Sequence, residues 1–101
     1  MITVLVKFKI SNELNLKTLK EKFIETSTLY VDVEGLLRKN YIADIEKGYA
    51  GGVYTFDSMQ DAKNWFDEDR INWITNRYSK PDIKFFESPV VVDNEKNQIL
   101  S

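Results

Sequence analysis

Apolar residues occupy every second position at the start of the chain, which is typical of a strand with one buried face. These positions are Ile2, Val4, Val6, Phe8 and Ile10. The pattern predicts a strand over residues 2–10. After the polar pair Ser11-Asn12, Leu16, Leu19 and Phe23 recur at helical spacing, which predicts an amphipathic helix from about residue 14 to residue 27.

The rest of the chain alternates in the same way between strand-like and helix-like segments. In order, we predict a strand over 36–45, a turn over 46–49, a strand over 50–56, a helix capped by Asp57 or Ser58, a second helical segment from the acidic break 67–69 to about Ser79, and a strand over 83–92. From Asp93 the chain is polar and we expect a loose tail. Within the second hairpin strand, Gly51-Gly52 indicates a bulge or the close approach of another backbone or a ligand.

The order strand, helix, strand, strand, helix, strand predicts a ferredoxin-like α+β fold: a four-stranded antiparallel sheet with its helices on one face. Residues 1–101 form one domain, in which 93–101 is the polar tail. The face of the first strand that carries Thr3, Leu5 and Lys7 is left uncovered. A second copy packed on this face would complete a dimeric α/β barrel, and the alternative is a monomer with a solvated sheet face. In a dimer we expect Val90–Val92 to pack on the partner.

The composition narrows the kinds of chemistry. Net charge is −2, which disfavours nucleic acid and anionic membranes as partners. The chain has no Cys and no His, so cysteine or histidine metal sites, thiol nucleophiles and histidine bases are excluded. No apolar run is long enough to cross a bilayer, and the absence of a leader pattern predicts a cytoplasmic protein. Asp67-Glu68-Asp69 lacks the ligand spacing of a calcium or magnesium loop, so we expect no metal.

Three stretches resemble a known family. They are Val33-Glu34-Gly35-Leu36-Leu37-Arg38-Lys39 with Glu46, then Ala50-Gly51-Gly52-Val53-Tyr54-Thr55-Phe56, then Asp61-Ala62. They are similar to the YdhR-type monooxygenase family of the dimeric α/β barrel superfamily, which includes the antibiotic-biosynthesis monooxygenases. The resemblance implies the fold, a homodimer, and oxygenase activity on an aromatic or polycyclic small molecule without metal, haem or flavin.

Such a reaction needs groups that orient an aromatic substrate and stabilise its anion. We place the candidate pocket between the sheet and the second helical region. Its candidate residues are Arg38, Asn40, Tyr54, Trp65, Trp73 and Tyr78. Arg38 and Asn40 share one strand face and would hold an oxyanion, or else form a dimer contact; Lys39 and Tyr41 share the other face.

Each aromatic candidate has a structural alternative. Trp65 falls on the stripe with Ala62 and Phe66, so it is either a core residue or a pocket wall. Trp73 lies four residues before Arg77, which suits a surface cation–π pair or a cleft rim. Tyr78 packs in the core or donates a hydrogen bond to a ligand.

The sequence therefore leaves two alternative functions. One is a cofactor-independent monooxygenase, and the other is a non-catalytic dimeric module that binds a small aromatic molecule or has only a structural role. Catalytic residues are not identified by the sequence.

Overall fold

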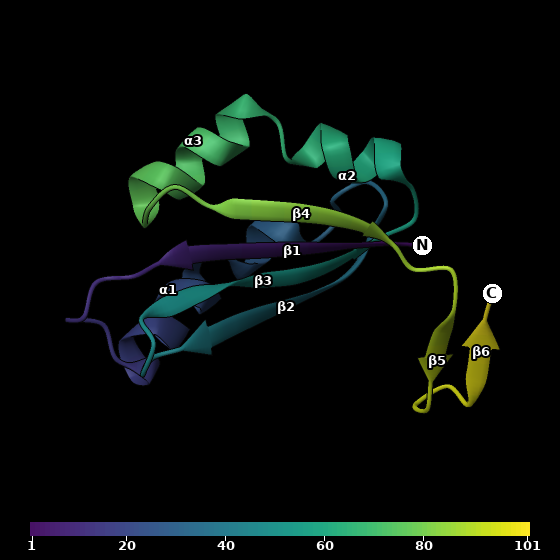
Figure 1. The fold of residues 1–101 in the computed structure, drawn as a ribbon, viewed down its shortest axis with the longest axis horizontal. Coiled ribbons are helices and arrows are strands. Elements are labelled where there is room, and N and C mark those ends of the chain that lie inside the picture. Colours follow the sequence, from purple (N-terminus) through teal and green to yellow (C-terminus); the bar gives the residue numbers. More distant parts are fainter.

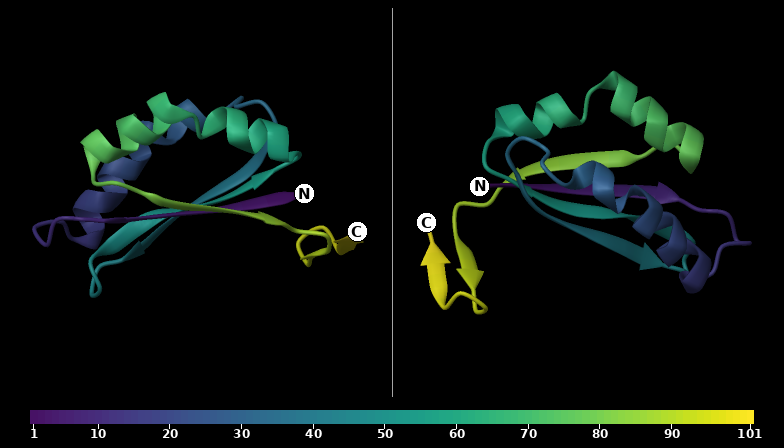
Figure 2. Two further views of the ribbon diagram at one scale, coloured as in Figure 1. Left: turned by 45° about the horizontal axis from the view of Figure 1, so that its top comes forward. Right: turned by 180° about the vertical axis from the view of Figure 1, so that it is seen from behind.

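The computed structural model describes residues 1–101. Its elements are β1 (Ile2–Lys9), α1 (Leu16–Ser27), the 3₁₀ turn η1 (Thr28–Tyr30), β2 (Leu36–Asp44), β3 (Tyr49–Phe56), α2 (Met59–Trp65), α3 (Glu68–Arg77), β4 (Asp82–Glu87), β5 (Val91–Asp93) and β6 (Gln98–Leu100). Four strands form an antiparallel sheet in the order β2-β3-β1-β4. The helices all lie on one face of this sheet (Figures 1 and 2). The predicted ferredoxin-like α+β fold is confirmed.

The core lies between the sheet and the helices, and it follows the alternation of β1. The four apolar side chains of that strand that face the helices are buried: Ile2, Val4, Val6 and Phe8. Leu19 of α1, Ala62 of α2 and Ile74 of α3 close over them from the helix layer. Burial of these side chains is the main force that holds the helices on the sheet.

Side-chain caps set where each helix begins. The Asn15 side chain accepts a hydrogen bond from the Thr18 amide at the start of α1, over 2.9 Å. The Ser58 hydroxyl accepts one from the Asp61 amide at the start of α2, over 3.1 Å. Asp67 caps α3, so the acidic break is a helix start that bends the chain between α2 and α3.

The β2–β3 hairpin differs from the expectation in its bulge. The register shifts between Leu36 and Arg38, whereas Gly51 and Gly52 stay in unbroken pairing with both neighbouring strands. The expectation of a bulge at the glycine pair is wrong, and the alternative of a close approach holds. A Cβ at Gly51 would collide with the backbone of Val6 on β1.

The C-terminal region also differs from the expectation. The last strand of the sheet ends at Glu87, because Pro89 has no amide hydrogen for a ladder. β5 then pairs with β6 in a separate hairpin that stands away from the sheet (Figure 1). The expected loose tail is therefore wrong: the Asp93 carboxylate accepts hydrogen bonds from the amides of Glu95 and Lys96, which closes the turn of the hairpin.

The second face of the sheet carries no helix (Figure 2). Apolar side chains on it are exposed, with Leu5 at 39%, Ile42 at 41% and Phe86 at 48% of their full accessible surface. Similar exposure occurs in the hairpin region at Val90, Val92 and Ile99. None of the helices has the length and apolar character required to span a membrane.

Candidate functional site

A small cavity lies between the sheet and the helices, and aromatic rings form much of its wall. It has a volume of about 20 Å³, which is room for about one water molecule. The side chains and backbone that line it are Val6, Phe8, Phe23, Thr26, Tyr30, Lys39, Tyr41, Gly51, Tyr54, Trp73, Ile74, Arg77 and Tyr78. They come from every layer of the fold, so the fold as a whole fixes their positions.

Lys39 places its ammonium group inside a cage of tyrosine rings. The Nζ atom lies 3.2 Å from the centroid of the Tyr30 ring, 3.7 Å from that of Tyr41 and 4.9 Å from that of Tyr54. Tyr41 and Lys39 project from β2, Tyr54 is the partner of Lys39 on β3, and Tyr30 closes the cage from η1. Three ring faces around one amine favour its cationic form locally.

Gly52 provides the space that this cage occupies. It faces the helices between Val6 and Tyr41 in the strand register. A Cβ at this position would lie 2.9 Å from Cε1 of Tyr54 and 3.3 Å from Cε of Lys39. The absence of a side chain at Gly52 therefore lets the lysine stem and the tyrosine ring pack close to the sheet.

Burial has a strong effect on the ionisable groups of the cage. It lowers the pKa of Lys39 to about 6, with the positive charge of Arg70 as a second cause. Burial raises the pKa of the Tyr30, Tyr41 and Tyr54 hydroxyls above their ordinary value. At neutral pH the site therefore holds a neutral amine among neutral phenols.

Tyr41 is fixed by contacts on two sides. Its hydroxyl forms a hydrogen bond of 2.8 Å with the Thr26 hydroxyl of α1. Its ring stacks on Phe23, with 4.5 Å between centroids, and meets Tyr30 edge to face at 6.0 Å. These contacts hold the cage wall in one orientation.

Arg77 lines the cavity from the end of α3. Its Nη2 donates to the Glu25 carboxylate over 3.1 Å and to the Lys22 carbonyl over 3.4 Å. Its Nε is buried and has no hydrogen-bond partner. A buried N–H donor without a partner is costly.

Three of the six predicted residues line this cavity: Tyr54, Trp73 and Tyr78. Tyr78 also stacks on Phe8, with 4.6 Å between the ring centroids, so it packs in the core and lines the cavity. Trp73 likewise forms the expected cation–π contact, with the Arg77 guanidinium carbon 5.7 Å from its ring centroid, and it lies at the cavity wall.

Trp65 lies beside the cavity and does not line it. Its ring meets Tyr30 edge to face at 5.5 Å, and the guanidinium carbon of Arg70 lies 3.9 Å from its centroid. Its indole Nε1 is buried without a partner. Trp65 contacts the cage through the Tyr30 ring and packs against the core.

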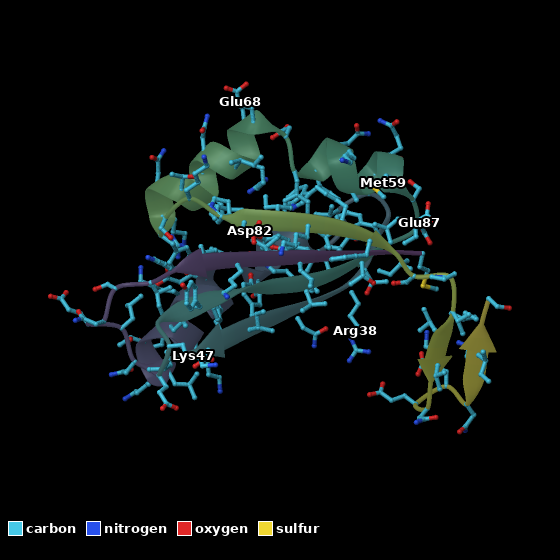
Figure 3. All side chains as sticks on the ribbon, viewed as in Figure 1. Arg38, Lys47, Met59, Glu68, Asp82 and Glu87 are labelled. Atoms are coloured by element: carbon cyan, nitrogen blue, oxygen red, sulfur yellow. The ribbon has the colours of Figure 1, made fainter.

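Arg38 and Asn40 lie on the opposite face of the sheet, so their expected position beside Tyr54 and the helices is corrected. Both side chains are exposed, and Figure 3 shows Arg38 projecting away from α2 and α3. The bulge at Leu37 is the reason. Leu36 faces the core opposite Phe56, but Arg38 pairs with Thr55 on the open face, so Lys39 takes the inward position.

Four residues of the site described above were absent from the six candidates: Lys39, Tyr30, Tyr41 and Arg77. A signal for Lys39 exists in its strand, because Tyr41 shares its face and an aromatic residue favours the covered side of a sheet. Tyr30 had no such signal, since it belongs to a single 3₁₀ turn after α1. No group of three or more acidic side chains is arranged to hold a metal ion.

Comparison with known proteins supports the fold. No protein-family model matches the chain, and no curated protein matches it. A solved structure of a putative antibiotic biosynthesis monooxygenase from Deinococcus radiodurans superposes with a TM-score of 0.68 over 92% of this chain and 97% of that chain, at 12% sequence identity. At this identity the similarity establishes the shared fold and leaves the chemistry open.

Proposed function

We propose that this protein is a YdhR-type monooxygenase that acts on an aromatic or polycyclic small molecule without a metal, haem or flavin. The observation that carries the proposal is the cavity between sheet and helices, whose lining includes the aromatic residues Tyr30, Tyr54 and Trp73. Its occurrence in a monooxygenase-like fold supports the oxygenase reading.

The proposed reaction uses the electrons of the substrate. Loss of a proton from a phenol or enol makes an electron-rich anion, which passes an electron to dioxygen. One oxygen atom then joins the activated carbon of a CH₂ group, which becomes a carbonyl, and the other leaves as water with the two hydrogens of that carbon. The role of the protein in this reaction is to orient the substrate, exclude water and stabilise the anion.

The cavity must widen to admit such a substrate. Its volume of about 20 Å³ is far below the roughly 300 Å³ of a typical small-molecule site. Tyr30 and Trp73 are the walls that we expect to move. Tyr30 sits in the turn η1 and Trp73 lies on α3, which is separated from α2 by the cap at Asp67.

We also propose that the protein is a homodimer built on the open face of the sheet. Leu5, Ile42 and Phe86 are exposed on this face, and a second copy would remove them from water. The hairpin β5–β6 lies beyond the end of β4 (Figure 1), with exposed Val92 and Ile99, a position suited to reach the partner.

A non-catalytic module that binds a small aromatic molecule or has only a structural role is the second candidate. The narrow cavity favours the structural role, because room for about one water is also what a packed aromatic core leaves behind.

Oxygen uptake separates the two candidates. The purified protein is mixed with a panel of phenols and enols that carry an activated CH₂ group, and dissolved oxygen is followed with an electrode. We expect uptake with at least one compound, loss of uptake in Trp73→Ala, and unchanged uptake in Asn76→Ala, an exposed residue of the same helix. Binding of the panel without any uptake would establish the binding module instead.

A further inference from the structure

Lys39 is a partly buried amine without a counter-ion. The two ion pairs in the chain join Arg77 to Glu25 and Lys84 to Asp82, so no carboxylate compensates a charge on Lys39. A cation removed from water without an anionic partner is strongly disfavoured. The tyrosine rings offset only part of this cost, because a cation–π contact contributes roughly 0.5–2 kcal/mol.

The surrounding groups keep the amine neutral. Arg70 of α3 adds a repelling charge, and Arg77 of the same helix is a second cation at the cavity wall. Glu25 of α1 is engaged by Arg77. The cage hydroxyls stay protonated because burial raises the pKa of each tyrosine. Lys39 is therefore the one side chain lining the cavity with a basic lone pair at neutral pH.

We propose that Lys39 is the general base of this site: it accepts the hydroxyl proton of a phenolic or enolic ligand. The inference rests on the proposed function, since it assumes an aromatic ligand in the cavity. In the step, the ligand O–H bond breaks and its electron pair stays on oxygen. The proton forms a new N–H bond at Nζ, so an ammonium and an aryloxide result and no electron is transferred.

The site is built to stabilise both products. The new ammonium lies against the faces of Tyr30 and Tyr41, within 3.7 Å of each ring centroid. The aryloxide gains the ammonium as a neighbour, and the guanidinium-bearing side chain of Arg77 lines the same cavity. In a water-poor cavity such charge-assisted contacts are strong. The neutral amine of Lys39, with the cation of Arg77 in the same cavity lining, thus suits a ligand that carries an acidic hydroxyl on an aromatic ring.

The protonation state of Lys39 tests this step directly. The protein is labelled with ¹³C at the lysine Cε atoms, and the Lys39 signal is assigned by its loss in Lys39→Met. Near neutral pH the free protein should show Lys39 as an amine. Saturation with para-nitrophenol should move this signal to the ammonium position, and saturation with para-nitroanisole, which has no hydroxyl proton, should leave it unchanged.

Affinities measured by calorimetry complete the test. Lys39→Met should weaken para-nitrophenol binding by at least about tenfold, with para-nitroanisole affected far less. Lys47→Met, at an exposed turn of the same hairpin, should match the parent protein. If both ligands bind while Lys39 stays neutral, the base assignment is overturned and the aromatic site stands. If neither ligand binds, the inference and the proposed function fall together. Proton transfer without oxygen uptake would support Lys39 and count against the oxygenase alone.

Discussion

Replacing Lys39 with methionine should change how the stability of the protein depends on pH. Burial, followed by the charge of Arg70, lowers the pKa of Lys39 from 10.5 to about 6. Between these values the unfolded chain binds a proton that the folded chain has released, so a rise in pH favours the folded state. Lys39 therefore destabilises the fold most at low pH, and this penalty disappears as pH approaches the unfolded pKa.

The size of this effect on the free energy of unfolding follows from the difference between the pKa of Lys39 in the unfolded and in the folded chain. Each pH unit changes the free energy of unfolding by about 1.4 kcal/mol, and the whole interval corresponds to about 6 kcal/mol. Lys39→Met removes the titrating group and keeps an apolar side chain of similar length. The difference in unfolding free energy, parent minus variant, should therefore rise with pH by about 1.4 kcal/mol per unit between about pH 6 and pH 10.

Urea unfolding at one protein concentration and several pH values measures this difference. Taking the difference between two proteins cancels the other titrating groups, which both share. Lys47→Met is the control and should run parallel to the parent. A parent-minus-variant difference that stays level across the range would refute the reasoning, because it would mean that Lys39 keeps its charge in the folded state.

Three further predictions concern packing and assembly. Gly52→Ala should destabilise the fold by about 1–3 kcal/mol in the same urea assay, because its Cβ would lie 2.9 Å from the Tyr54 ring. Unchanged stability would show that the Tyr54 ring can move aside without cost. Phe56→Ala should cost about 3–5 kcal/mol, since Phe56 is fully buried at 0% exposure, whereas Arg38→Ala should stay within about 0.5 kcal/mol. A chain ending at Ser88 should dimerise more weakly than the full chain in light scattering, and equal dimerisation would remove the β5–β6 hairpin from the interface.

The alternation of apolar and polar residues predicted the strands of the sheet, because one face of the sheet is packed against the helices. Alternation in β1 marked Val4 and Val6 as buried, and both are at most 1% exposed. The same rule did not reach across β2. Counting by twos from Leu36 places Arg38 with the core, and the bulge at Leu37 reverses that placement. A single inserted residue in the ladder leaves no mark in the sequence. The inward lysine was missed because the Arg38 face was chosen for the ability of Arg and Asn to hold an oxyanion, over the signal that Tyr41 gave for the other face.

The aromatic residues of the helices were easier to find than the cage. Trp73 and Tyr78 stood out by residue type, and both line the cavity. The cage depends on Tyr30, 24 residues before its neighbour Tyr54 in the chain, and its ring reaches that residue at 5.9 Å only through tertiary packing. The C-terminal hairpin was missed for a local reason: its strands have three residues each, which is too short for a period to be read.

The central claim is that an aromatic ligand binds inside the sheet–helix layer, and methyl NMR tests it most directly. Val6 lines the cavity, and its neighbour Leu5 is exposed on the open face. Titration with para-nitrophenol should shift the Val6 methyl signals and the Trp73 indole signal while the Leu5 methyl signals stay in place. Shifts confined to Leu5 and its open-face neighbours would contradict the account.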